Sequence, residues 1–298
     1  MRILNRAGRL TLVTDVGVVD VAEASAGRFG PDVQEIYARW GEFRAWVQSC
    51  PPGSLPVTPM PSHAEVGPPV PRPAQVFAIG LNYKSHALES GLELPVRPMV
   101  FTKFPASIAG PYDAISLPTA AVDWEVELVA VIAEGGRNVS EEKAWSHVAG
   151  LTIGQDISER DLQVTPPAPQ QFSLAKSFVG FAPIGPQLVT PDEFENPDDI
   201  QISCTLGTEQ MQVGRTGDLI FSVPRLVSYL SSVLPLLPGD LIFTGTPSGI
   251  GWARKPQRFL TAADELITTV EGIGQMRNTF LAGPERAWEN AVPTAVSV

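Results

Sequence analysis

The sequence predicts an α+β fold that is mostly β, with a small N-terminal domain ahead of a larger one. Proline and glycine are frequent, at 29 and 26 of 298 residues, which favours a loop-rich and strand-rich protein over a helical bundle. Strand-like segments outnumber helical ones and lack the regular strand–helix alternation of a doubly wound sheet. The stretch from Pro51 to Pro73 holds nine prolines, is not expected to form regular structure, and divides the chain.

The N-terminal domain is expected to cover residues 1–72, including the proline-rich linker. Residues 2–22 have the pattern of two short strands and a turn. A helix follows, because apolar side chains between Val33 and Val47 recur at the spacing of one helical face.

The main domain is expected to cover residues 73–281, and residues 282–298 to form a loose tail. It starts with a strand, "QVFAIGLNY", and a short helix, "YKSHALES", that Gly91 ends. Ser140 is the expected N-cap of a helix that runs through Ala149 and stops before a glycine. The later segments predict, in order, a strand at "LTIGQDI", a hairpin at "ISCTLGTEQMQVG", a helix at "FSVPRLVSYLSSVL", a strand and glycine loop at "GDLIFTGTPSGIG", and a last strand at "DELITTVEGIG".

The charge balance limits the partners. A net charge of −11 and a pI of about 4.8 disfavour nucleic acid and anionic membranes. The N-terminal "MRILNRAGRLTLV" is interrupted by arginines, unlike a signal peptide, and no apolar run is long enough to cross a bilayer. Cys50 and Cys204 lie far apart and read as reduced thiols. We therefore expect a soluble, cytoplasmic protein.

The stretch "VDWEVELVAVI" is unusual because an otherwise buried strand carries two glutamates on one face. Side chains alternate along a strand, so Glu125 and Glu127 share a face with Val129 and Val131. Two ionised carboxylates at an apolar surface repel each other and are costly to desolvate, so a positive charge is expected between them. An exposed edge strand with its polar residues outward is the alternative.

A third carboxylate, Asp156, closes the apolar run "AGLTIGQD" at the end of a predicted strand. Oxygen ligands without clustered histidine or cysteine favour a hard cation, Mg²⁺ or Mn²⁺, with Ca²⁺ as a further option. Three carboxylates leave about three coordination positions for water or a chelating substrate.

His86 and Glu89 lie three residues apart on the predicted short helix, and hence on one face. A carboxylate beside an imidazole fixes its tautomer and raises its basicity, as the deprotonation of water requires. A solvent-exposed surface pair is the alternative. The other histidines, His63 in the linker and His147 on the capped helix, are poorer candidates for a base.

Lys176 is a lone lysine in the apolar stretch "FSLAKSFVG", where it either reaches solvent along its stem or serves a site. Arg160 and Gln163 follow Asp156 closely and could reach the same cleft. "FTGTPSGIG" lacks the lysine of a P-loop, yet its backbone amides and Thr246 could hold a carboxylate. A plain loop is the alternative there.

Taken together, these segments resemble the fumarylacetoacetate hydrolase family. The resemblance runs from about Val76 to Asn278 and rests on an ordered set of motifs. It implies several packed layers of mixed β-sheet with few helices, usually assembled as a homodimer. The N-terminal part resembles the small extra domain of many bacterial members. The motifs are "GLNYKSHALE", "FTKFPAS", "VDWEVELVAVI", "GQDISERDLQ", "LAKSFVGFAPIGP", "LPGDLIFTGTPSGIG" and "VEGIGQMRN".

The resemblance also assigns roles to the candidate residues. It implies a divalent metal held by Glu125, Glu127 and Asp156. The H-x-x-E of a mobile lid falls on His86 and Glu89. The remaining positions of the family motifs fall on Lys176, Arg160, Gln163 and Thr246.

The family contains several activities, and its motifs do not separate them. The favoured one is hydrolysis of a C–C bond in a 2,4-dioxo acid such as fumarylpyruvate, giving pyruvate and a carboxylic acid. His86, backed by Glu89, would activate water, while Lys176 and Gln163 would stabilise the oxyanion and pyruvate enolate would leave. The alternative is decarboxylation, or isomerisation or tautomerisation of a 2-oxo or 2-hydroxydienoate acid through the same enolate. A non-catalytic, metal-binding member is a lesser alternative.

One departure from the family bears on the substrate. Many members carry aspartate after K-S-F, where this chain has Val179. If Val179 lines the pocket, an acceptor has been replaced by an apolar wall. We then expect a preference for substrates whose far end is apolar.

Overall fold

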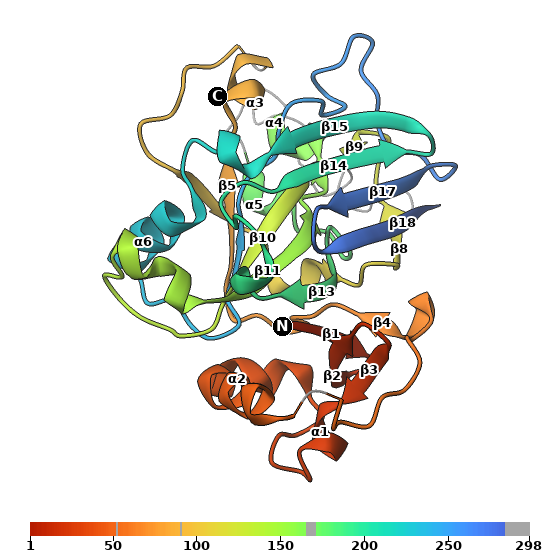
Figure 1. Ribbon diagram of the computed structural model, residues 1–298. Helices are drawn as coiled ribbons and strands as arrows, with labels where there is room; N and C mark the ends of the chain where they lie inside the picture. The colour runs from red at the N-terminus through yellow and green to blue at the C-terminus, as the bar shows by residue number, and fades with distance from the viewer. Residues whose placement is uncertain (52, 90, 165–170, 284–298) are drawn as a thin grey trace, which may run out of the picture.

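Figure 1 shows the computed structural model, which describes residues 1–51, 53–89, 91–164 and 171–283. Within these ranges the chain forms an 11-stranded sheet, a five-stranded sheet and a two-stranded ribbon. Strands dominate and the helices are short, as the sequence predicts. None of the helices in the described ranges combines the length and the hydrophobicity needed to cross a bilayer.

The 11-stranded sheet is the centre of the molecule. Every residue of its strands β10 (Val126–Ile132) and β11 (Val148–Gln155) is buried, since the sheet is covered on both faces. Its strands in spatial order are β3 (Gly17–Asp20), β2 (Arg9–Thr14), β1 (Arg2–Arg6), β13 (Ala182–Val189), β11 (Val148–Gln155), β10 (Val126–Ile132), β16 (Leu241–Phe243), β5 (Val76–Gly80) and β6 (Met99–Thr102), with β4 (Val66–Gly67) beside β1 and β7 (Ile108–Ala109) beside β13.

The two faces of β10 belong to two different hydrophobic cores. Val126 and Leu128 pack into one core, and Val129 and Val131 into the other. This confirms the alternation expected from the sequence. The alternative prediction of an exposed edge strand is therefore wrong, because β10 lies between β11 and β16 in the interior of the sheet.

The five-stranded sheet packs on the Leu128 side of the large sheet, where β14 (Gln201–Leu206) contacts β10 and β17 (Glu265–Val270) contacts β11. The predicted hairpin is confirmed as β14 and β15. The prediction that "DELITTVEGIG" is the last strand is wrong, since β18 follows it. Asn278 is buried at an inward position of β18, so the apolar alternation that predicts a strand is interrupted there. The order is β15 (Glu209–Arg215), β14 (Gln201–Leu206), β17 (Glu265–Val270), β18 (Gly274–Ala282) and β8 (Ala114–Leu117).

The N-terminal segment, which carries β1, β2, β3 and α2 (Trp40–Ser49) in the lower part of Figure 1, packs on the opposite face of the large sheet. Residues 2–22 hold three strands where two were predicted, and the helix expected from Val33 is a 3-10 helix, η1 (Val33–Arg39), that continues as α2. The linker is not wholly irregular, because β4 lies within it and pairs with β1. Its other short elements are α1 (Val21–Ala24) and η2 (His63–Glu65).

The N-terminal strands share a sheet with the rest of the chain, because β1 pairs with β13. The division at residue 72 stays a prediction. The expected tail, 282–298, begins at the last residue of β18, and residues 284–298 lie outside the described residues.

The helix expected from Ser140 through Ala149 is wrong in type and length. It is a 3-10 helix, η4 (Glu141–His147), and the Ser140 side chain makes no capping hydrogen bond. The chain then enters β11, where a Cβ on Gly150 would lie 2.6 Å from the carbonyl oxygen of Val189. Gly150 therefore permits close strand packing and does not end a helix.

The predicted helix at "FSVPRLVSYLSSVL" is confirmed as α6. It contacts η4, and both lie at the left of Figure 1. The remaining helical elements are α3 (Lys84–Glu89), η3 (Pro105–Ser107), α4 (Arg160–Val164), α5 (Phe172–Ala175), η5 (Pro191–Glu193), η6 (Thr216–Asp218) and α6 (Val223–Val233).

Candidate metal centre and active-site cavity

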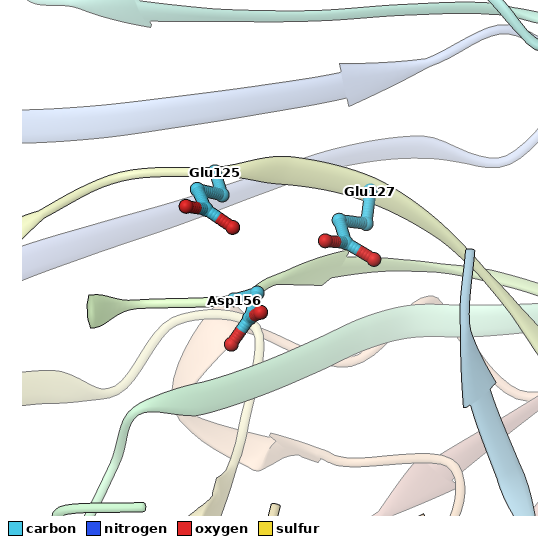
Figure 2. Close-up of side chains that lie close together, drawn as sticks. All are labelled: Glu125, Glu127 and Asp156. Carbon is cyan, nitrogen blue, oxygen red and sulfur yellow. The ribbon is translucent and has the colours of Figure 1, made fainter. Parts of the chain in front are cut away.

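Three buried carboxylates meet where β10 begins and β11 ends. Glu125 directly precedes β10, Glu127 lies in it, and Asp156 follows β11, which pairs antiparallel with β10. One oxygen from each carboxylate can be chosen so that all three lie within 4.8 Å of one another. Figure 2 shows Glu125 and Glu127 side by side on one strand, with Asp156 on the neighbouring segment. The structure thus brings together the three predicted ligands.

The predicted continuous strand is interrupted just before β10. β9 (Val122–Asp123) pairs with β12 (Ser158–Glu159), and the chain then leaves that ladder before β10 starts. Side-chain oxygens accept hydrogen bonds from the backbone N–H groups between the two ladders, and this fixes the main chain at Glu125. The N–H groups of Trp124, Glu125 and Val126 donate to Asp123 Oδ1 at 2.8 Å, Gln155 Oε1 at 2.9 Å and Gln212 Oε1 at 2.9 Å, respectively.

Two buried lysines face the carboxylates. Lys176 Nζ donates to Glu125 Oε2 at 2.8 Å and to Asp156 Oδ2 at 2.7 Å. Lys176 is only 2% exposed, so the alternative that it reaches solvent is wrong. Lys103 Nζ donates to Asp156 Oδ1 at 2.5 Å and to the carbonyl oxygen of Lys176. Lys103 therefore holds both a candidate ligand and the segment that carries Lys176.

Arg160, at the start of α4, is held between two acids. Its guanidinium lies 2.7 Å from Glu125 Oε1 and 2.8 Å from Asp123 Oδ2, and its Nη1 donates to Gln163 Oε1 at 2.8 Å. Asp123 also accepts from the backbone N–H groups of Gly251 and Trp252, at 2.7 and 2.9 Å. One buried carboxylate thus ties the arginine to the glycine-rich loop.

Sequence reasoning missed Lys103 and Asp123. Asp123 continues the alternation of Glu125 and Glu127, so the same period of two that found the pair could have found it. Lys103 stands in the quoted segment "FTKFPAS" as a lone lysine between apolar residues, which is the only local signal it gives.

The carboxylates differ in how much positive charge lies close to each of them. Burial alone would raise the pKa of Glu125, but the charges of Lys176 and Arg160 outweigh it and lower the pKa to about 2. Burial, together with the charges of Asp156 and Glu125, raises the pKa of Glu127 well above its usual range. Glu127 is therefore the carboxylate that lacks a cation, although it accepts from Gly245 N–H at 2.6 Å.

The residues present fit a hard divalent cation. They offer three converging carboxylate oxygens, and one of the carboxylates is short of positive charge. Gly245 supports this arrangement because its φ of 101° turns the N–H toward Glu127, and a Cβ there would lie 2.7 Å from Asn82 Cβ.

Thr246 follows Gly245 in the loop after β16. Its Oγ1 accepts from Gln212 Nε2 at 2.8 Å, which leaves the hydroxyl hydrogen to donate elsewhere. Gln212 also donates to the carbonyl oxygen of Pro247 at 2.8 Å. Buried polar side chains thus hold this loop in place, and its role in binding a carboxylate stays a prediction.

The predicted pair on α3 also lies at the site. His86 is buried, and its Nδ1 lies 3.5 Å from Glu89 Oε2. Both Glu89 oxygens accept from the backbone N–H of Gly249, at 3.0 and 3.1 Å. Because Nδ1 faces Glu89, Nε2 is the nitrogen left to face the cavity that His86 lines. A surface pair is ruled out by the burial of His86.

A cavity of about 370 Å³, within the usual size range of small-molecule sites, lies beside the carboxylate cluster and is lined by Glu125, Lys176 and His86. Val179 is not among its lining residues and is 80% exposed, so the expectation that Val179 shapes the pocket is wrong. Val179 precedes a glycine in a turn after α5, where its side chain points to the surface. The polar side chains that line the cavity are His86, Glu125, Arg160, Gln163, Lys176 and Thr246.

Comparison with known proteins decides the family. Residues 75–281 match the profile described as "Fumarylacetoacetate (FAA) hydrolase C-terminal". The chain belongs to the fumarylacetoacetate hydrolase family. It is an enzyme of this family, and the fold expected from the resemblance is confirmed.

Several individual relatives are similar over most of their length. The human protein "Oxaloacetate tautomerase FAHD2A, mitochondrial" is 40% identical over 226 residues, which are 75% of this chain and 71% of that protein. A solved "putative HpcE protein" of Mycobacterium smegmatis is 52% identical with a TM-score of 0.90, over 95% of this chain and 100% of that one. A solved "probable 2-hydroxyhepta-2,4-diene-1, 7-dioateisomerase" of Mycobacterium abscessus is 29% identical with a TM-score of 0.78, over 96% and 99%.

The buried Asp123–Arg160 pair gives a first testable consequence. Asp123→Asn is expected to lower the free energy of unfolding by about 3 kcal/mol, because it leaves a buried guanidinium short of one counter-charge. Denaturant unfolding measures this. The exposed pair Asp199–Arg215 provides the control, since Asp199→Asn is expected to cost less than about 1 kcal/mol. Equal effects of the two substitutions would contradict the prediction.

Proposed function

We propose that the protein is a divalent-metal-dependent tautomerase or isomerase that moves a proton at C3 of a 2-oxo acid. The observation that carries this proposal is one cavity that is lined by Glu125 of the carboxylate cluster, by Lys176 and by His86. The activities named for the human relative and for the Mycobacterium abscessus protein are a tautomerisation and an isomerisation. They support the alternative drawn from the sequence better than the hydrolysis that the sequence analysis favoured.

Glu125, Glu127 and Asp156 would hold the metal, proposed as Mg²⁺ or Mn²⁺, with Ca²⁺ as a further option. When bound, the ion supplies a Lewis acid that polarises the 2-oxo group and so makes the neighbouring C3–H more acidic.

Lys176 supplies a fixed positive charge beside that position. Burial alone would lower the pKa of Lys176, but the charges of Asp156 and Glu125 outweigh it and raise the pKa above its usual value. Lys176 is therefore an ammonium at neutral pH and donates toward the oxygen on which negative charge develops.

Gln163 and Thr246 orient the substrate in this proposal. Gln163 Oε1 accepts from Arg160, which turns the amide so that its NH₂ group is the donor side. Thr246 accepts from Gln212 and can therefore donate its own hydroxyl hydrogen. Both lie on the wall of the cavity and suit the oxygen atoms of a carboxylate.

His86 carries the proton. Its Nδ1 is turned toward Glu89, which in turn is held by the Gly249 N–H, so the ring presents Nε2 to the substrate. In the enolising direction Nε2 takes the proton from C3 and the enolate oxygen takes up a proton from solvent, and in the ketonising direction the enol oxygen releases its proton while Nε2 delivers one to C3. The keto and enol forms therefore contain the same atoms.

C–C bond hydrolysis is the second candidate, and the His86–Glu89 pair is the observation that favours it. The same imidazole could instead take a proton from water, which would attack the distal ketone of a 2,4-dioxo acid.

The experiment that separates the two follows enol absorbance and products together. Acylpyruvates and enol 2-oxo acids are incubated with enzyme and Mg²⁺ or Mn²⁺, and pyruvate is quantified. Loss of enol absorbance without pyruvate release is the result expected of the tautomerase or isomerase. Stoichiometric release of pyruvate and a carboxylic acid from an acylpyruvate would instead identify the hydrolase, and no metal-dependent change on any substrate would reject both.

The proposed assembly is a homodimer, as the family resemblance implies. Light scattering coupled to size-exclusion chromatography tests it directly.

A further inference from the structure

We propose that the substrate carries an uncharged, apolar group beyond C4, which the apolar half of the active-site cavity binds. This inference rests on the proposed function and extends it to the class of substrate. It replaces the expectation based on Val179, because other side chains make the apolar wall.

The lining of the cavity combines polar and apolar side chains. The polar ones, called here the polar half, include Glu125 of the carboxylate cluster and its two cations, Lys176 and Arg160. The apolar ones, called here the apolar half, come from β6, α5, the chain after α3 and the loop after β16. These are Leu92, Met99, Phe101, Phe172, Ile250 and Trp252.

The apolar half begins next to Lys176. The Lys176 ammonium lies 5.1 Å from the centre of the Phe101 ring, within range of a cation–π contact. The Phe101 and Phe172 rings are tilted against each other with centroids 5.7 Å apart. A substrate held at Lys176 by its oxygen atoms would therefore meet aromatic rings with the carbons that follow.

Met99 and Gly80 set the shape of this wall. The two residues lie opposite each other where β5 pairs with β6, and both line the cavity. A Cβ on Gly80 would lie 2.0 Å from Met99 Cε, so the methionine occupies space that any other residue at position 80 would fill. The floor of the apolar half is thus a methionine side chain lying on a glycine.

A second carboxylate has no partner in this half. Among the described residues that line the cavity, the only lysine and arginine are Lys176 and Arg160. Both already pair with Glu125, and Lys176 also pairs with Asp156. A carboxylate that lies against methionine and aromatic rings without a partner gives up part of its hydration and is disfavoured. A carboxylate at C4 stays near the polar half, so the restriction concerns C5 and beyond.

The test compares three ligands by titration calorimetry with the full chain and Mg²⁺. Oxalate has two carboxylates and no tail, 2-oxoadipate has a carboxylate at its far end, and 6-methyl-2-oxoheptanoate has an isopropyl group in that place. We expect 6-methyl-2-oxoheptanoate to bind at least about tenfold tighter than 2-oxoadipate, since each buried methylene contributes about fourfold in affinity and the buried carboxylate has no partner.

Charged variants sharpen the comparison. Met99→Lys should lower the ratio of the two affinities by about tenfold or more, because it supplies a cation for the distal carboxylate. Phe172→Lys, on a different element, should act in the same direction, so the test survives if one variant does not fold. Val179→Lys is the matched control and should leave the ratio unchanged, because Val179 lies outside the cavity.

The outcomes distinguish this inference from the proposed function. If oxalate binds but wild type prefers 2-oxoadipate, or shows no preference, the apolar half is not a substrate subsite and the inference is overturned. If oxalate does not bind in the presence of metal, the proposed function fails and this inference fails with it.

Discussion

Replacing Glu127 with glutamine is expected to reduce the affinity for Mg²⁺ or Mn²⁺ by more than about 100-fold. The loss should exceed the roughly 10–100-fold that outer-shell partners of a metal contribute, because a ligand is removed. Glutamine keeps the shape of the side chain and an oxygen that can accept from Gly245 N–H, so the change is confined to the charge.

The same substitution should not destabilise the metal-free protein. The pKa of Glu127 is raised in the folded chain, by burial first and then by Asp156 and Glu125. A carboxyl group with a raised folded pKa disfavours folding at pH values above its unfolded pKa, so at neutral pH its removal should leave stability equal or higher. Metal titration and denaturant unfolding of the same variant measure the two effects.

Glu271→Gln is the control for this prediction, because Glu271 is an exposed carboxylate whose nearest cation, Arg215, lies 3.7 Å away. It should change neither metal affinity nor stability by a measurable amount. Wild-type metal affinity in the Glu127→Gln protein would remove Glu127 from the metal centre.

His86→Ala is expected to lower kcat by about 100-fold or more, the usual contribution of a general acid–base group. His86 is the one histidine among the described residues that line the cavity, and its Nδ1 faces Glu89. Glu89→Gln should cause a smaller loss, because the imidazole remains and only its orientation and basicity are weakened. Steady-state rates of enol loss measure both.

His147→Ala is the matched control, since the His147 ring lies against the carbonyl oxygen of Glu134, outside the cavity. It should leave kcat unchanged. An unchanged kcat in His86→Ala would exclude the imidazole from the proton transfer. If His86→Ala lost pyruvate release but kept exchange at C3, His86 would be the base of the hydrolytic candidate instead.

The metal centre could be predicted from the sequence because its residues obey a local rule. Strand alternation places Glu125 and Glu127 on one face, and the end of an apolar strand marks Asp156. The structure adds that β10 and β11 are neighbours, which the sequence could not establish, since pairing is decided by packing across the whole sheet.

Two supporting residues, Gln212 and Lys103, could not be predicted, because they act across long distances in the chain. Gln212 reaches Val126 and Thr246 from the second sheet, and Lys103 reaches Asp156 from the loop after β6. Neither residue shows a spacing that singles it out. The Val179 expectation failed for a related reason, since a position three residues from Lys176 can face the opposite way in an irregular segment.

The type of helix could not be predicted from the apolar pattern either. The apolar spacing after Val33 predicts a helix and cannot distinguish a 3-10 helix from an α-helix. At η4 the cap residue and the glycine suggested an α-helix, while pairing of the next residues with β10 and β13 ended it early.

Solvent deuterium incorporation at C3 of 2-oxobutyrate, followed by proton NMR, tests the proposed chemistry most directly. This short acid has neither a second carboxylate nor a long tail, so its exchange depends on the polar half of the cavity alone. With wild type and Mg²⁺ we expect exchange at least about 100-fold faster than with Glu127→Gln, and no cleavage product. Exchange at the same rate in both proteins, or in wild type after chelation of the metal, would contradict metal-dependent proton transfer at C3.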